Sequence, residues 1–283
     1  MIKLGLIGQS IAKSRSPSLH IMLGEIHGHA VSYELHEPRD AGPEAFAQTL
    51  ARLRDEGYRG CNVTFPYKQL AVSHADRVNE AVRLVGSTNT LVLDEEISAA
   101  NTDYTGFIRG YRHRLGDSAA GRVLLLGAGG VGRAVAFGVF ELGATEVQVF
   151  DLNQAGARAL SDSLNAAGCK ASVVSAEALA DAARSADGLV NCTPVGHYKT
   201  PGNPLPTSLF GGQRWAFDAV YTPLDTEFLT AAHGQGLKLV SGFDLFIFQG
   251  IDAFEIFTGV QVDPADLPAR FKQAFDIRSE LIA

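Results

Sequence analysis

The 283-residue chain has few of the residues that mark several specialised protein classes. Its three cysteines, Cys61, Cys169 and Cys192, are far apart and odd in number, which fits neither a disulfide framework nor paired zinc ligands. A reducing, cytoplasmic environment is therefore expected. Basic residues are also scarce, because 24 Lys+Arg stand against 31 Asp+Glu for a formal net charge of −7. This balance argues against nucleic acid or an anionic membrane surface as a partner.

Long apolar runs are missing as well. The first apolar stretch, residues 4–8, is too short for the core of a signal peptide, and no uncharged apolar run approaches the roughly 20 residues that span a bilayer. No linker rich in Pro, Gly or Ser divides the chain, and the densest basic run, residues 111–114, is expected to be a solvated helix end. The hydrophobic share of 46% allows a substantial core and roughly two domains.

What the chain does contain is an alternation of short apolar runs with longer amphipathic stretches. In the first third, strands are predicted at residues 3–7, 31–36, 60–64 and 90–93, helices at 18–27 and 43–56, and a hairpin strand at 95–100. A second series continues the pattern with segments at 122–126, 130–142, 146–150, 155–167, 171–174, 176–184, 188–191, 214–218, 226–235 and 238–240. Helices follow at 245–258 and 268–281. This order predicts two α/β domains with mostly parallel sheets, packed side by side around a cleft.

A glycine motif opens the second series. The predicted strand 122–126 is followed by a G-x-G-x-x-G segment consisting of Gly127, Ala128, Gly129, Gly130, Val131 and Gly132. Gly127 allows a tight turn, Gly129 lets the backbone approach a pyrophosphate, and Gly132 lets the next helix pack closely on the strand. Free N–H groups at the helix start then attract the phosphates. A glycine-rich turn without a ligand is the alternative, but the flanking strand and helix favour a dinucleotide site.

An acidic residue follows the next predicted strand. Asp151 stands 24 positions after Gly127, where a carboxylate accepts hydrogen bonds from the ribose 2′-OH of NAD and repels the 2′-phosphate of NADP. The first arginine beyond it is Arg158, so no adjacent guanidinium would hold that phosphate. Asp151 as a helix N-cap before Gln154 is the alternative, and the two roles are compatible. We expect NAD as the cofactor, with NADP weaker.

Polar side chains gather after the strands of the first series. They lie in the segments Ser14–His20, Asn62–Lys68, Thr88–Thr90 and Asn101–Asp103. Loops at strand ends are where α/β proteins place their ligands. Ser14 and Ser16 stand two apart on a segment expected to be extended, so both point the same way and can share one carboxylate. These donors suit a small polyhydroxylated acid.

Together these segments resemble the shikimate/quinate dehydrogenase family. The similarity runs from Leu4 to the last helix and includes, in order, S-x-S-P-x-x-H (14–20), N-V-T-x-P-x-K (62–68), N-T-D followed by Gly106, the glycine motif, N-x-T-P-x-G (191–196), D-x-x-Y-x-P (218–223) and Gln249. The resemblance implies a substrate-binding α/β domain at 1–103 and an NAD-binding Rossmann domain at 104–240. It also implies C-terminal helices at 241–283 that pack back on the first domain.

The resemblance implies residue roles too. Lys68 and Asp103 match the catalytic pair of the family. The implied substrate-binding set is Ser14 and Ser16 for the carboxylate, Thr64, Asn89, Asp103 and Gln249 for the ring hydroxyls, and Tyr221 lining the cleft. The cofactor set comprises the glycine motif, Asp151 and Thr193.

Elementary chemistry agrees with the implied pair. Hydride removal from a secondary alcohol needs a group that takes the hydroxyl proton or stabilises the developing alkoxide, and a lysine can do this when a neighbour shares the proton. An aspartate beside it orients the ammonium. Singly, each residue has a structural alternative: Lys68 as a surface lysine, Asp103 as an N-cap, and Ser16-Pro17 as an ordinary helix start. Only their joint occurrence in order favours catalysis.

Some positions depart from the family pattern. Asp151-Leu152-Asn153 stands where NADP-specific members often carry Asn-Arg-Thr, Gly86-Ser87-Thr88 replaces Gly-Ala-Val, and Leu245 replaces a methionine. His197 also stands at a methionine position; we expect a solvent-facing loop residue there, with a ligand or base as the alternative. No metal site is expected, because His20, His27, His29 and His36 cluster only in sequence.

Ser16 bears on the substrate, because members devoted to quinate can carry threonine at this position. We predict NAD-dependent oxidation and reduction between shikimate and 3-dehydroshikimate, with quinate and 3-dehydroquinate as the second pair. The alternatives are a family member acting on a related ring acid such as an amino-shikimate, and a non-catalytic ligand sensor, against which Lys68 and Asp103 argue. The expected partners are a ring hydroxy acid and, as an open alternative, a second copy in a homodimer; nucleic acid and membranes are not expected.

Overall fold

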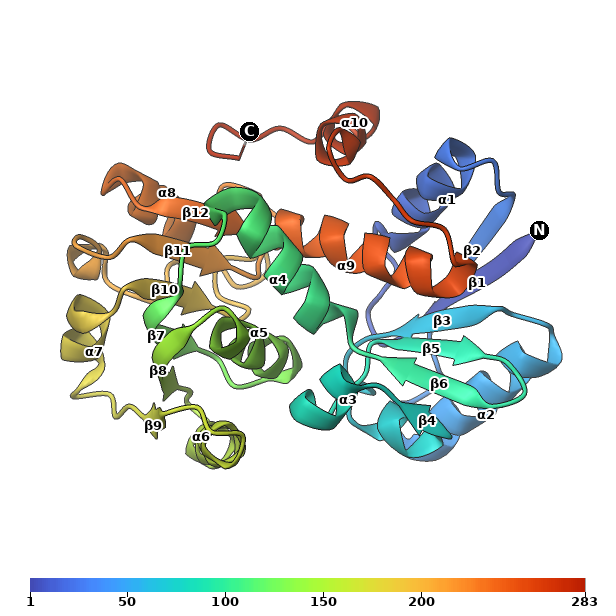
Figure 1. Cartoon of the computed structure of the whole chain (residues 1–283), viewed down its shortest axis with the longest axis horizontal. Coiled ribbons are helices and arrows are strands. Elements are labelled where there is room, and N and C mark those ends of the chain that lie inside the picture. The colour runs from blue at the N-terminus through green and yellow to red at the C-terminus, as the bar shows by residue number, and fades with distance from the viewer. Residues whose placement is uncertain (283) are drawn as a thin grey trace. The chain divides into compact units, whose positions relative to one another are not determined.

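A computed structural model of the chain describes residues 1–282, which form two compact units (Figure 1). Unit 1 comprises Met1–Gly106 and Ile247–Leu267, and unit 2 comprises Phe107–Phe246 and the chain from Pro268 onward. The chain passes from one unit to the other three times, within α4 (Thr102–Leu115), within α9 (Gly242–Thr258) and after the first residue of α10 (Leu267–Ala274). Each unit contains a six-stranded sheet, so the predicted α/β class with two sheets is confirmed.

The sheet of unit 1 combines parallel strands with a hairpin, in the order β2-β1-β3-β5-β6-β4. β1 is parallel to β2 and β3, whereas β5 is antiparallel to β3 and β6. The strands are β1 (Ile2–Ile7), β2 (Val31–His36), β3 (Gly60–Val63), β4 (Arg77–Val78), β5 (Thr90–Leu93) and β6 (Ile97–Ala100). The helices besides α4 and α9 are α1 (Ser16–Ile26), α2 (Pro43–Asp55), α3 (Glu80–Val85) and a 3₁₀ turn at Leu70–His74.

Apolar side chains fix the loops of unit 1 to this sheet. Phe46, Leu50 and Leu53 recur at helical spacing on α2 and are buried in the core below β3. On α1, Leu19 lies against Gly250 of α9, where an added Cβ would come within 2.3 Å of its side chain. Buried side chains on α1 and α2 therefore anchor the segments that follow β1 and β2.

The sheet of unit 2 is entirely parallel, in the order β12-β11-β10-β7-β8-β9. This is the doubly wound order of a Rossmann fold, whose ligand crevice opens where the order reverses, here between β7 and β10. The strands are β7 (Gly121–Leu126), β8 (Ala144–Phe150), β9 (Ala171–Val173), β10 (Gly188–Asn191), β11 (Trp215–Asp218) and β12 (Lys238–Ser241). The helices are α5 (Gly130–Glu141), α6 (Gln154–Ala166), α7 (Leu179–Ser185), α8 (Glu227–Gly234), α10 (Leu267–Ala274) and a 3₁₀ turn at Thr207–Leu209.

Several boundaries differ from the sequence predictions for local reasons. α1 begins at Ser16 and not at residue 18, because Pro17 occupies its first turn. α9 begins at Gly242 and not at residue 245, because Asp244 accepts hydrogen bonds from the N–H and the hydroxyl of Ser241 and so fixes the first turn. α10 ends at Ala274, well before residue 281. The prediction of a solvated helix end at residues 111–114 is wrong for Tyr111, which is fully buried and meets Trp215 edge-on.

The most apolar helix is α9, and it is buried on nearly all sides. Eleven consecutive residues, Ser241–Ile251, contain only one that is not buried, Gln249. A helix that is apolar all round belongs in a core or a bilayer. Over residues 1–282, no helix combines the length and hydropathy needed to cross a membrane. The burial of its residues makes α9 a core helix, with its first residues in unit 2 and its last in unit 1.

Candidate functional site

Lys68 and Asp103 form a largely buried ion pair. Lys68 follows the loop after β3, Asp103 lies in the first turn of α4, and Lys68 Nζ stands 2.5 Å from Asp103 Oδ2. Their side chains are 14% and 10% exposed. Asn101 Oδ1 accepts the N–H of Tyr104, so Asn101 provides the cap of α4. The alternative of Asp103 as an N-cap is therefore wrong, and its carboxylate is directed to the lysine.

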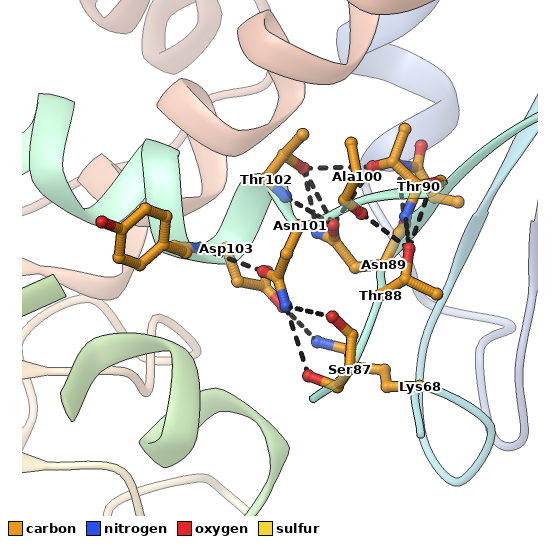
Figure 2. A network of polar contacts seen from close by, with 11 residues as sticks. Lys68, Ser87, Thr88, Asn89, Thr90, Ala100, Asn101, Thr102 and Asp103 are labelled. Atoms are coloured by element: carbon orange, nitrogen blue, oxygen red, sulfur yellow. Dashed lines mark hydrogen bonds and ion pairs between the residues drawn. The ribbon is translucent and has the colours of Figure 1, made fainter. Parts of the chain in front are cut away.

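A buried polar network holds the start of α4 (Figure 2). Asn89 Nδ2 donates to Thr102 Oγ1 at 2.9 Å, and Asn89 Oδ1 accepts the N–H of Thr102 at 2.7 Å. Asn101 Nδ2 donates to the carbonyl of Ser87 at 2.8 Å. Asn89 has two Nδ2 protons, and the described contacts use one of them. The network fixes Asp103 while leaving Asn89 one donor for a ligand.

The main chain on both sides of Lys68 is also anchored. The carbonyl of Lys68 accepts the N–H of Thr88 at 2.8 Å. The side chain of Tyr67 is buried and stacks on Phe46, and its hydroxyl donates to the carbonyl of Asp40 at 2.6 Å. Anchoring the loop at two points reduces the conformational entropy that Lys68 loses when it holds one position.

Ser14 and Ser16 lie together at the start of α1. Their Oγ atoms are 3.2 Å apart, and the N–H of Ser16 donates to Ser14 Oγ. The predicted extended segment is instead a turn at residues 12–13 that leads into α1. Both side chains are partly exposed, so a carboxylate can reach both hydroxyls.

Tyr33 and Asn62 link the serines to the network around Asn89, and neither belongs to the predicted substrate-binding set. Tyr33 Oη donates to Asn62 Oδ1 at 2.8 Å, and Asn62 Nδ2 donates to the carbonyl of Asn89 at 3.1 Å. Burial raises the pKa of Tyr33 well above its usual value, while a hydrogen bond with Ser16 acts in the opposite direction. The N-V-T motif pointed to Asn62, but no sequence signal distinguished Tyr33 from an ordinary buried strand residue.

The two other predicted residues of unit 1 lie on elements that pack against these segments. Thr64 follows β3, and its methyl group packs on the backbone of Gly8, where an added Cβ would be 2.2 Å away. Gln249 lies on α9, and its backbone N is 2.5 Å from the Cβ position of Gly106. Gly106 stands three residues after Asp103 on α4, so this close approach holds Gln249 near the turn that carries Asp103.

The glycine motif in unit 2 has room for a dinucleotide. Gly127 has φ +95°, a Cβ on Gly132 would fall 1.9 Å from the carbonyl oxygen of Gly127, and nothing lies within 4 Å of the Cβ position of Gly129. The conformational reasons predicted for Gly127 and Gly132 are confirmed. The N-cap of α5 is Gly129, and no side chain caps the first-turn N–H groups. These residues fit the pyrophosphate of a dinucleotide.

Asp151 orders the turns beside this loop. Its Oδ2 accepts the N–H of Ala128 at 2.7 Å, and its Oδ1 accepts the N–H of Asn153 at 2.7 Å. The N-cap of α6 is Asn153, so the capping alternative for Asp151 is wrong. Each carboxylate oxygen keeps a lone pair for a ribose hydroxyl. Next to it, Leu152 is 91% exposed.

The remaining predicted residues of unit 2 follow β10 and β11. Thr193 N and Oγ1 both donate to Asn191 Oδ1, at 3.0 and 2.7 Å, and Tyr221 stacks on Phe246. His197 lies in the same loop, where its Nδ1 accepts the N–H of Lys199. Within residues 1–282, no group of three or more His, Cys, Asp or Glu side chains is arranged to hold a metal ion.

Comparison with known proteins decides the family. Residues 6–91 match the shikimate dehydrogenase substrate binding domain, and residues 98–207 match the C-terminal domain of alanine dehydrogenase/PNT. The chain is 37% identical to the quinate/shikimate dehydrogenase (NAD(+)) of Corynebacterium efficiens, covering 95% of this chain and 97% of the relative. The chain belongs to the shikimate/quinate dehydrogenase family. Two further similar proteins extend the comparison.

The first is the shikimate dehydrogenase (NADP(+)) of Streptomyces avermitilis, 38% identical over 92% of this chain and 91% of that one. The second is the solved quinate dehydrogenase from Corynebacterium glutamicum in complex with NAD, with a TM-score of 0.89, 36% identity, and coverage of 96% and 99%. Membership makes this chain an oxidoreductase of the shikimate/quinate type with a nicotinamide dinucleotide cofactor. The relatives differ in their named cofactor and substrate.

The buried Asp218 generates a testable pH dependence. Burial raises its pKa from 3.8 to about 7, although hydrogen bonds from Thr226, Val220 and Asn191 act in the opposite direction. Because the folded pKa exceeds the unfolded one, this group stabilises the fold fully below about pH 3.8, and the contribution is lost as the pH rises to about 7, by at most about 1.4 kcal/mol per pH unit.

Asp218→Asn removes the titration and keeps an oxygen acceptor, so urea unfolding of both proteins at about pH 5 and about pH 7 measures the effect. We expect the free energy of unfolding of the wild type to fall between these pH values relative to the variant. Parallel pH dependence in the two proteins would show that Asp218 ionises without cost.

Proposed function

We propose that this chain oxidises the ring hydroxyl of shikimate with NAD and reduces 3-dehydroshikimate in reverse, with quinate as a second substrate. The observation that carries the proposal is the buried contact between Lys68 and Asp103, at 2.5 Å. Asp103 lies in the first turn of α4, whose start is held by the hydrogen bonds of Asn89 to Thr102. An ion pair buried to this degree costs desolvation energy, and a structural role alone is a weak reason to keep it. Family membership supplies the reaction type.

Lys68 and Asp103 would handle the proton of the substrate hydroxyl. Lys68 donates to Asp103 and has two further N–H donors, and Asp103 Oδ1 remains as an acceptor. A ring hydroxyl seated between them donates to the carboxylate and accepts from the ammonium. Bound NAD supplies the chemistry of hydride acceptance. As the hydride leaves, the hydroxyl proton would pass to the Asp103 carboxylate, and the Lys68 ammonium would donate to the developing alkoxide and offset its charge.

The serine pair would hold the substrate carboxylate. Ser14 and Ser16 present two hydroxyls 3.2 Å apart, which matches the two oxygens of a carboxylate. Quinate carries an extra hydroxyl on the carbon that bears this carboxylate, so the side chain at position 16 influences the choice between the two acids. A serine there favours shikimate and leaves room for quinate. The second N–H of Asn89 would bind a ring hydroxyl from the other side of the network.

NAD preference rests on Asp151. Its two oxygens accept main-chain N–H groups of the glycine loop and of Asn153, which holds the carboxylate beside the loop that would bind the pyrophosphate. A 2′-phosphate of about −1.5 to −2 charge would meet this carboxylate at close range. The relatives named for NAD and for NADP are equally similar, so the preference depends on this local argument.

Initial rates of reduced-cofactor absorbance with shikimate and with quinate, each with NAD and with NADP, test the proposal. We expect turnover of shikimate with NAD at the highest kcat/KM and slower turnover of quinate. No turnover of either acid with either cofactor would reject the proposal and favour a related ring acid or ligand sensing.

Replacing Lys68 by alanine should lower kcat by about 10²–10⁴, the usual range for a proton-transfer group, with a much smaller change in the KM of the ring acid. Steady-state kinetics with shikimate and NAD measure both constants. Lys170→Ala, which removes a lysine whose side chain is 73% exposed in unit 2, is the matched control and should leave kcat unchanged. Near-normal turnover by the Lys68 variant would remove this residue from the mechanism.

Ser14→Ala and Ser16→Ala should mainly raise the KM of the ring acid, because each removes a bond to a carboxylate held throughout the reaction. A charge-assisted hydrogen bond is worth roughly 1.5–3 kcal/mol, or about 10- to 150-fold in KM. Ser18→Ala, in the same turn of α1, is the control. Ser16→Thr should shift the ratio of quinate to shikimate turnover. If both alanine variants keep the wild-type KM, the serines are structural.

The wild type should prefer NAD by at least about a hundredfold in kcat/KM, which corresponds to about 2.7 kcal/mol. Asp151→Ser with Leu152→Arg should erode the preference, because the guanidinium pairs with the 2′-phosphate. Asp151→Asn is the matched control: it removes the charge but keeps an acceptor for the loop, so it should improve NADP use without abolishing NAD binding. Equal use of both cofactors by the wild type would limit Asp151 to ordering the loop.

A further inference from the structure

Asp218, at the end of β11, is a fully buried carboxylate that the proposed chemistry does not use. Three hydrogen bonds reach it from three segments of unit 2. Oδ1 accepts from Asn191 Nδ2 at 2.9 Å and from the N–H of Val220 at 3.0 Å, and Oδ2 accepts from Thr226 Oγ1 at 2.6 Å. Asp218 therefore joins the ends of β10 and β11 to the N-cap of α8.

Asn191 passes this constraint to the loop after β10. Its Oδ1 accepts from the N–H and the hydroxyl of Thr193, and its second Nδ2 proton is donated to the carbonyl of Val195 at 3.0 Å. The amide of Asn191 can bind Asp218 and Val195 with its nitrogen only if its oxygen faces Thr193. Val195 and Asp218 together set the orientation of Asn191, and Asp218 is the contact that ties the amide, and with it Thr193, to the end of β11.

The loop positioned in this way lies directly against the glycine turn. A Cβ on Gly127 would fall 2.8 Å from the carbonyl carbon of Cys192 and 2.9 Å from the nitrogen of Thr193. This contact occurs between β7 and β10, where the strand order reverses and Rossmann folds bind their dinucleotide. A shift of residues 192–193 would therefore displace the backbone that packs against the glycine turn.

We propose that Asp218 is a positioning residue for the cofactor, which acts through Asn191 to hold Cys192 and Thr193 against the glycine turn. This inference rests on the proposed function only in assigning a nicotinamide dinucleotide to that turn. The two carboxylate oxygens bind different segments. Oδ1 accepts from Asn191 and so positions the loop after β10. Oδ2 accepts from Thr226, whose hydroxyl also accepts the N–H of Leu229 as the cap of α8.

The division between the two oxygens supplies a matched control. Asp218→Ala and Asn191→Ala each release the loop, whereas Thr226→Val removes only the bond at Oδ2 and the helix cap. Asp218→Asn keeps Oδ1 as an acceptor for Asn191 and is the conservative rescue. The readout is the Kd of NAD, or of NADP if the wild type binds it more tightly, measured by calorimetry without any ring acid, together with the Tm of each protein.

We expect Asp218→Ala and Asn191→Ala to weaken cofactor binding at least about tenfold, and the double variant to be no weaker than Asn191→Ala within about twofold, because both act on one path. Thr226→Val should lower the Tm by about 2–4 °C for each kcal/mol lost and leave the Kd within about twofold. Asp218→Asn should stay within about threefold of the wild type. Wild-type affinity in Asp218→Ala, multiplied effects in the double variant, or equal weakening by Thr226→Val would each overturn the proposal.

Asn191→Asp covers the case in which the alanine variants do not fold, because it keeps the size of the side chain and the acceptor for Thr193. It replaces the N–H donors to Asp218 and Val195 by a carboxylate oxygen and should weaken cofactor binding at least about tenfold. Wild-type affinity in this variant would contradict the positioning role. Because calorimetry uses the cofactor alone, a wild type that binds it but turns over neither shikimate nor quinate would reject the proposed function and still test Asp218.

Discussion

The contact between the ammonium of Lys68 and the carboxylate of Asp103 is the constraint on which unit 1 depends. Both side chains are nearly buried, and removing each charge from water costs several kcal/mol, which only good geometry offsets. The surrounding structure supplies that geometry: Asn101 caps α4, Asn89 holds Thr102, and Thr88 fixes the carbonyl of Lys68. Residues that flank β3, β5 and β6 thus hold this charged pair in place.

The main constraint in unit 2 is different: the backbone of the glycine turn must come close to a phosphate. Gly132 approaches the carbonyl of Gly127 so closely that any side chain would collide with it, and Asp151 fastens the loop by its bond to Ala128. The buried Asp218 acts through Asn191 to hold residues 192–193 against the same turn. Two carboxylates therefore order the nucleotide loop from β8 and β11, and neither has an ion-pair partner within residues 1–282 that the structure describes.

Residue patterns predicted the strands and the glycine turn well, because both depend on local spacing and on backbone conformation. The link from Ser16 through Tyr33 to Asn62 was not predictable, since it depends on register: Leu4 faces Tyr33 on β2 and Leu6 faces Asn62 on β3, with β1 between them. The capping interpretations of Asp103 and Asp151 failed for a related reason. Asn101 and Asn153 compete for the caps, and only tertiary structure decides which side chain turns away.

Chemical rescue tests the central claim, that the Lys68 ammonium stabilises the alkoxide as the substrate proton leaves. In Lys68→Gly, a small primary amine added to the solution can occupy the space of the side chain. We predict that kcat/KM for shikimate, reduced by about 10²–10⁴, rises linearly with amine concentration, and that the rescued rate depends on the pKa of the amine as general acid–base catalysis requires. A Lys68→Gly variant that is inactive with every amine, or active without one, would contradict the account.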